Sequence, residues 1–195
     1  MVLRVGHHRV MAHLPPSSTR QLWILRHAKA ADAPRGGRDR DRPLGDRGRR
    51  DATALGRQLA STGPLFDNPG LVRPDLALCS VAVRTVQTGV LVLGQLADEV
   101  PVHTYINLYE AEPDTVLTYL HEVDENARSV LVVGHNPTVY RLTWDLLAEG
   151  SDDRYRLEQR GFPTCALAVV DLACEGWEDE VGGQGTLIGL FSPPY

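Results

Sequence analysis

The stretch 21–27, with the sequence QLWILRH, is a short apolar run that ends in an arginine and a histidine. An apolar run of this length predicts a strand that is covered on both faces of a sheet. A second apolar run, 129–133, is followed closely by His135, and a third, 75–79, is followed by Arg84. Ligands bind at the carboxyl edge of open α/β sheets, so we expect these histidine and arginine side chains to meet there.

Helices and strands are predicted to alternate along the rest of the chain. Apolar residues at helical spacing predict helices that begin at Asp46, Ser80, Pro113 and Pro137, of which the second is expected to run to Ala97. Polar segments with several glycines and prolines, above all 28–45, are expected to be loops.

A further strand is expected at 100–105. The last third of the chain departs from this alternation, since the charged segment 149–162 is predicted to be a loop. Two closing strands, 165–172 and 186–191, have no helix between them, so part of the sheet is expected to be antiparallel. The pattern predicts an α/β fold, namely a three-layer α/β/α sandwich with a mostly parallel central sheet.

Length and composition limit the function classes. The chain has 195 residues, and we expect a single domain at 21–195 behind a flexible leader at 1–20. The net charge of −5 argues against a nucleic-acid surface, and no apolar stretch is long enough to span a membrane. Three cysteines without metal-ligand spacing indicate a reducing compartment, so we expect a cytoplasmic protein. We also expect the protein to be a monomer.

The histidines and arginines at the predicted sheet edge suit phosphoryl chemistry. Two imidazoles and two guanidiniums form a compact cationic pocket that matches the charge of a phosphoryl group. A neutral histidine is also a good phosphoryl acceptor, since its pKa lies near neutrality and it needs no separate base. The chain is therefore expected to bind, and to be able to transfer, a phosphoryl group.

Several short motifs carry a family resemblance through their order and spacing: Leu25-Arg26-His27, Asp41-Arg42-Pro43-Leu44, Arg47-Gly48, Cys79-Ser80, Arg84-Thr85, Gln87-Thr88, Leu108-Tyr109 and Val133-Gly134-His135-Asn136-Pro137. Over residues 21–172 the chain thus resembles the histidine phosphatase superfamily, whose fold is phosphoglycerate mutase-like, and within it the bacterial phosphohistidine phosphatase branch. The resemblance implies that His27 is the nucleophile and forms a phosphohistidine. It also implies that Arg26, Arg84 and His135 bind phosphate, and that no metal or other cofactor takes part. The chain departs from the commonest motif in carrying Ala28 where most members have glycine.

Other site residues are left open by the sequence. Arg42 is a candidate phosphate ligand, and a salt bridge within its loop is the alternative. Glu110 is our candidate for the acid that protonates the leaving group, with Glu112 and Asp32 as alternatives. An imidazole leaving group needs little help from an acid, so the site can also work without one.

We therefore expect a metal-independent phosphatase that acts on protein phosphohistidine. A phosphatase of sugar phosphates or nucleotides and a non-catalytic phosphate-binding module are the alternatives. A cysteine phosphatase is disfavoured because only four residues, none of them glycine, separate Cys79 from Arg84. A metal site at His27 and His135 is disfavoured because the neighbouring arginines repel a cation.

Overall fold

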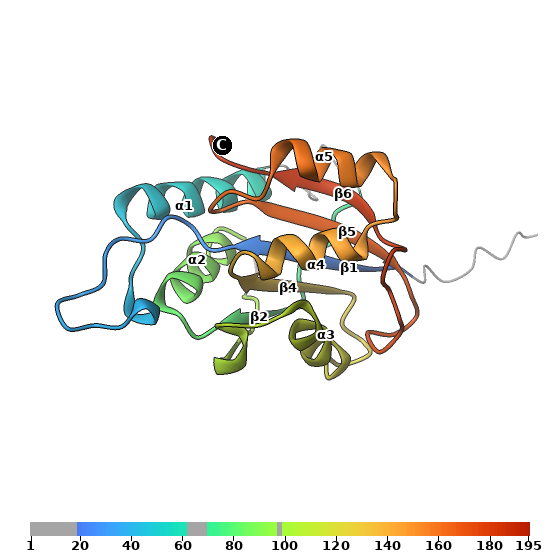
Figure 1. Ribbon diagram of the computed structural model, residues 1–195, viewed down its shortest axis with the longest axis horizontal. Helices are drawn as coiled ribbons and strands as arrows, with labels where there is room; N and C mark the ends of the chain where they lie inside the picture. Colours follow the sequence, from blue (N-terminus) through green and yellow to red (C-terminus); the bar gives the residue numbers. More distant parts are fainter. Residues whose placement is uncertain (1–18, 62–69, 97–98) are drawn as a thin grey trace, which may run out of the picture.

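One mixed sheet of six strands forms the centre of the molecule (Figure 1). The computed structural model describes residues 19–61, 70–96 and 99–195, so the first 18 residues of the predicted leader lie outside the described part of the chain. The strand order is β3-β2-β4-β1-β5-β6. The strands are β1 (Thr19–Arg26), β2 (Leu76–Ser80), β3 (Val102–Tyr105), β4 (Ser129–Gly134), β5 (Leu167–Ala173) and β6 (Thr186–Phe191).

The first four strands are parallel and the closing pair changes direction. β2 pairs with β3 and β4, and β4 pairs with β1, all in parallel. β5 lies antiparallel to β1 on one side and to β6 on the other. This arrangement confirms the expected mostly parallel sheet with an antiparallel part, since the connection between β5 and β6 contains no helix of the kind that usually makes a parallel crossover.

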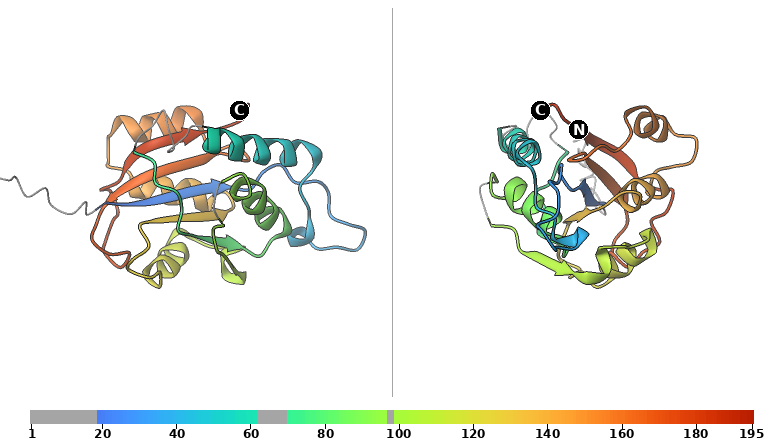
Figure 2. Two further views of the ribbon diagram at one scale, coloured as in Figure 1. Left: turned by 180° about the vertical axis from the view of Figure 1, so that it is seen from behind. Right: turned by 60° about the vertical axis from the view of Figure 1, so that its left-hand side comes forward.

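Helices cover both faces of the sheet (Figure 2, right). α1 (Asp46–Ser61) and α2 (Val83–Leu93) pack on one face. The other face is covered by α3 (Pro113–His121), α4 (Thr138–Leu146) and α5 (Asp152–Arg160). Two short 3-10 helices, η1 (Asp39–Asp41) and η2 (Ile106–Leu108), lie in the connections. The predicted three-layer α/β/α sandwich is therefore confirmed.

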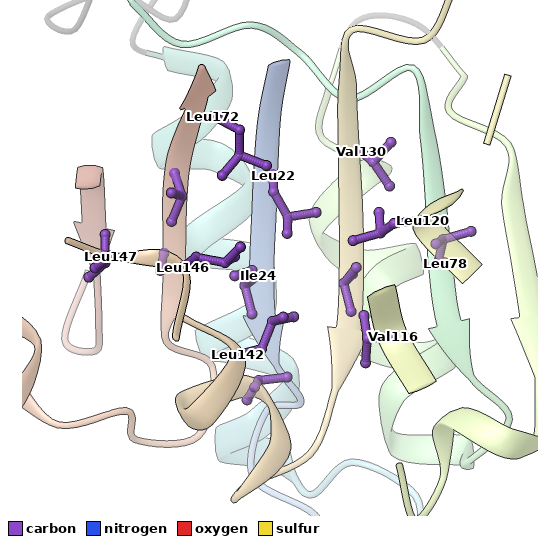
Figure 3. Close-up of a cluster of buried hydrophobic side chains, with 14 of the residues drawn as sticks. Leu22, Ile24, Leu78, Val116, Leu120, Val130, Leu142, Leu146, Leu147 and Leu172 are labelled. Carbon is purple, nitrogen blue, oxygen red and sulfur yellow. The ribbon is translucent and has the colours of Figure 1, made fainter. Parts of the chain in front are cut away.

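The two hydrophobic cores follow from the alternation of side chains along each strand. In β1, Leu22 and Ile24 join the core under α3, α4 and α5, which Figure 3 shows in close-up. Trp23 and Leu25, from the same strand, join the core under α1 and α2. All four side chains are 1 % exposed or less, so β1 anchors the sheet and fixes where its last residues emerge.

Two local predictions were wrong. The segment 149–162 is not a loop throughout, because α5 lies within it and is capped by the hydroxyl of Ser151. Leu157 is its one buried residue, so the sequence shows no apolar periodicity there. The helix expected from Ser80 to Ala97 is shorter than predicted: Ser80 ends β2, and α2 begins at Val83 and ends at Leu93, where Gly94 is the C-cap.

Candidate active site

Strand register brings the two key histidines together. Arg26 of β1 pairs with Gly134 of β4, so the residues that follow them, His27 and His135, emerge side by side at the carboxyl edge of the sheet. Their ring centroids lie 5.1 Å apart. The predicted meeting of residues that are far apart in sequence thus occurs where β1 and β4 end.

The chain around His27 holds its ring in one tautomer. Nδ1 lies 2.8 Å from the carbonyl oxygen of Ala28. A carbonyl oxygen only accepts hydrogen bonds, so Nδ1 must carry the proton and Nε2 keeps its lone pair. The backbone of His27 is itself fixed, because its N–H donates to Gly134 and its carbonyl accepts from Cys165.

Burial keeps His27 neutral. Desolvation, helped by the positive charges of Arg84, Arg26 and Arg42, lowers the pKa of His27 to about 4, although the hydrogen bond to the Ala28 carbonyl acts in the opposite direction. The neutral ring is the form that can attack phosphorus, so a nucleophile is available without a general base.

His135 is held between Ser80 and Arg84. Its Nδ1 lies 3.4 Å from Nη2 of Arg84, which can only donate, so Nδ1 accepts and Nε2 donates to the hydroxyl of Ser80 at 2.9 Å. Burial, helped by the nearby Arg84 charge and by the repulsion that a second proton on the two neighbouring histidines would meet, lowers the pKa of His135 to about 3. His135 is therefore also neutral in the absence of an anion.

Arg84 lies in the first turn of α2 and is only 7 % exposed. It donates from Nη1 to the backbone carbonyl of Asp39 at 2.8 Å and from Nη2 to the Asp39 carboxylate at 3.0 Å. Its own carbonyl accepts from the hydroxyl of Thr88, which in turn accepts from the N–H of Ala28 at 3.0 Å. These bonds connect α2 directly to the segment that carries His27.

Arg26 has a donor left over. Its Nη1 donates to the carbonyl of Phe162 at 2.8 Å, whereas its Nε is buried and has no hydrogen-bond partner among the described residues. A buried donor without a partner is costly, so this nitrogen marks Arg26 as a residue whose hydrogen bonding is incomplete.

Arg42 makes the loop contacts that the sequence left as an alternative. Its Nε donates to the carbonyl of Ala31 at 2.9 Å, and its Nη1 pairs with the Asp39 carboxylate at 3.1 Å. Its charge contributes to the lowered pKa of His27, which places it within electrostatic reach of the nucleophile. A direct contact with phosphate stays a prediction.

The three candidate acids make no hydrogen bond to the histidines or arginines of the site in the described part of the chain. Glu112 pairs with Arg141 at 2.7 Å instead. Asp32 is exposed, and Glu110 is an exposed residue lining a cavity of about 510 Å³ that it shares with Tyr109. The role of each as a proton donor stays a prediction.

Sequence reasoning missed three residues of the site. Asp39 lies in the charged loop before Arg42, which carries no other signal. Ser80 is predicted from the sequence to begin a helix, and Tyr109 enters the sequence analysis only as part of a motif. The Tyr109 ring lies 5.5 Å from His135 and 5.7 Å from the guanidinium carbon of Arg84. The Leu108-Tyr109 motif is the sequence signal that could have identified Tyr109. For Asp39, the run of alternating charges at 39–42 is the one sequence signal.

Two further features of the described residues bear on function. No group of three or more histidine, cysteine, aspartate or glutamate side chains in this part of the chain is arranged to hold a metal ion. None of its helices combines the length and the apolar character that crossing a bilayer requires.

Comparison with known proteins agrees with this geometry. Residues 22–115 match the sequence model described as the histidine phosphatase superfamily (branch 1). An uncharacterized protein of Mycobacterium tuberculosis (strain ATCC 25618 / H37Rv) is 35 % identical over 171 residues, which cover 87 % of this chain and 99 % of that protein.

Solved structures show the same likeness. The putative phosphohistidine phosphatase SixA from Nakamurella multipartitia has a TM-score of 0.75 and 30 % identity, covering 93 % of this chain and 100 % of that one. A protein histidine phosphatase SixA complexed with tungstate has a TM-score of 0.67 and 28 % identity, covering 89 % and 97 % of the two chains.

Proposed function

Because this chain belongs to the histidine phosphatase superfamily, we propose that it is a phosphatase in which His27 takes the phosphoryl group from a protein phosphohistidine. The observation that carries the proposal is the Nδ1 contact of His27 with the Ala28 carbonyl, since it leaves a neutral Nε2 with a free lone pair. The charges of Arg26, Arg84 and Arg42 lie close enough to the ring to lower its pKa.

The reaction has two in-line steps. In the first, Nε2 of His27 forms a bond to phosphorus while the bond from phosphorus to the substrate imidazole breaks, and the leaving nitrogen takes up a proton from the solvent at the open site. In the second, water attacks the phosphorus of phospho-His27, which releases inorganic phosphate and restores the neutral ring. The arginines neutralise the charge on the equatorial oxygens in both steps, and the buried Nε of Arg26 supplies one donor.

Three features support phosphohistidine as the substrate. Between Arg84 and His135 the described residues form, after the rest of α2, only β3, η2, α3 and β4 as regular elements, and none of these forms a lid domain that would enclose a small substrate. The two structures reported above bear the descriptions of phosphohistidine and protein histidine phosphatases. An imidazole leaving group also suits a site whose candidate acids make no hydrogen bond to its histidines or arginines in the described residues.

The cellular setting belongs to the same proposal. Cys79, Cys165 and Cys174 are all free and buried, as is usual where disulfides do not form. We propose a cytoplasmic monomer that works without a metal or other cofactor and meets its phosphoprotein substrate at the open edge of the sheet.

Trapping of the phosphoenzyme tests the proposal. Wild type, H27A and, as a matched control, H121A (His121 lies at the end of α3) are incubated with a ³²P-labelled phosphohistidine protein and quenched in alkaline denaturant. Label and turnover are expected in wild type and H121A, and neither in H27A. Turnover by H27A would refute the assignment of His27 as the nucleophile. A higher kcat/KM for p-nitrophenyl phosphate or a sugar phosphate than for the phosphoprotein would refute protein phosphohistidine as the substrate.

A further inference from the structure

The geometry around Arg84 points to a further functional residue. We propose that Asp39 is a positioning residue that holds Arg84, Arg42 and Tyr109 in the arrangement that receives the phosphoryl group. The anion-binding part of this inference rests on the geometry alone, whereas its effect on turnover rests on the proposed function.

Four hydrogen bonds from side chains in three parts of the chain end on Asp39. Its backbone carbonyl accepts from Nη1 of Arg84 at 2.8 Å, and its Oδ2 accepts from Nη2 at 3.0 Å. The same oxygen accepts from the hydroxyl of Tyr109 at 2.6 Å, and Oδ1 accepts from Nη1 of Arg42 at 3.1 Å. Asp39 therefore connects the loop 28–45 with α2 and with the residue that follows η2.

The contact with Arg84 is the one that bears on catalysis. A guanidinium has five N–H donors in a rigid plane, and a clamp that uses one donor from each terminal nitrogen fixes the orientation of that plane. The second N–H of Nη2 donates to Nδ1 of His135 at 3.4 Å, so the second N–H of Nη1 and that of Nε stay available for a ligand. Arg84 is 7 % exposed, so its charge needs a counter-ion when no anion is bound, and the Asp39 carboxylate supplies it.

Asp39 acts as an anion and not as an acid. Hydrogen bonds from Tyr109 and Arg42 lower the pKa of Asp39 to about 2, so it has no proton to give to a leaving group near neutral pH. Its side chain is 53 % exposed, which shows that it is not held there by burial. The contacts with the three donors account for its position.

A competing role makes the opposite prediction. If the Asp39 carboxylate instead occupied the place of the phosphoryl group, removing it would free Arg84 and tighten anion binding. If it positions Arg84, removing it lets the guanidinium turn away and weakens anion binding. The sign of the change therefore decides between the two roles.

The test compares D39A and D39N with D41N. Asp41 is a matched control from the same 3-10 helix, because its carboxylate accepts from the N–H of Arg38 at 2.9 Å and pairs with Arg40 at 3.9 Å. D41N makes the same charge change as D39N without touching Arg84. Tungstate, as a phosphate analogue, is titrated by calorimetry into each folded variant, and kcat and KM are measured with the phosphohistidine protein.

We expect D39A to bind tungstate about 10- to 100-fold more weakly, as loss of a charge-assisted hydrogen-bond clamp implies. D39N retains an acceptor and should lose less, about 3- to 10-fold, while D41N should match wild type. In D39A, kcat should fall as well as the affinity, and D39N, which keeps an acceptor, should show the same direction of change with a smaller loss of stability.

Unchanged or tighter tungstate binding by D39A and D39N would overturn the inference, and D39N alone decides if D39A does not fold. If the wild type does not dephosphorylate phosphohistidine while D39A still weakens tungstate binding, the proposed substrate fails and the role of Asp39 stands.

Discussion

The acid limb of the activity profile should lie at about pH 4 and not near pH 6.5. Protonation of Nε2 removes the lone pair of His27, so kcat/KM should be constant at neutral pH and should fall as the pH drops through the pKa of His27 in the free enzyme. Burial and three nearby arginines lower that pKa to about 4. His135, with a pKa of about 3, should titrate only at still lower pH.

The size of the effect follows from the shift. A histidine with a pKa of about 4 is about 90 % neutral at about pH 5, whereas one with an ordinary pKa near 6.5 is about 3 % neutral. At that pH the protein should therefore retain almost full activity, about 30-fold more than an unshifted nucleophile would allow.

The assay is an NMR titration of the His27 ring in ¹³C-histidine-labelled protein, with H27N used to assign its signal. R42Q provides a graded test, because Arg42 is one of the three charges that lower this pKa and its removal should move the midpoint upward. R57Q, an exposed charge change on α1, is the matched control. A His27 signal that titrates near pH 6.5 in wild type would refute the account of the neutral nucleophile.

Three further predictions concern backbone packing, Cys79 and metals. A Cβ at Gly48 would lie 2.2 Å from the Lys29 carbonyl oxygen, so G48A should lower the free energy of unfolding by about 1–3 kcal/mol despite the better helix propensity of alanine. Denaturant unfolding measures this change. The control G182A, whose Cβ would meet only the Asp145 carbonyl oxygen at 3.9 Å, should leave the free energy of unfolding unchanged. Burial raises the pKa of the Cys79 thiol to about 12, so C79S should keep kcat near the wild-type value, and complete loss of turnover in a folded variant would revive a thiol mechanism. Because Arg26, Arg84 and Arg42 surround His27, EDTA should leave the steady-state rate unchanged, and a loss restored by added divalent cations would contradict this.

The regular part of the fold could be predicted because burial imposes a local pattern. The strands β1, β2 and β4 are each covered on both faces, so their residues form continuous apolar runs. These runs made it possible to predict the strands, and the edge of the sheet where they end, from the sequence. α5 could not, since it buries only Leu157 and is otherwise charged. Its start depends on the Ser151 cap and its end on Gly161, whose φ is +62°, neither of which produces an apolar period.

The sequence by itself determined which side chains stand at the carboxyl edge of the sheet, because strand length and the order of apolar runs are encoded locally. Only the tertiary structure decided how those side chains are charged and oriented. The β1–β4 register sets His27 beside His135, and the Ala28 carbonyl selects the tautomer of His27. Asp39 joins Arg84 and Tyr109 across 45 and 70 residues of chain. Contacts over such separations depend on how the strands and helices pack together, so no local sequence pattern predicts them.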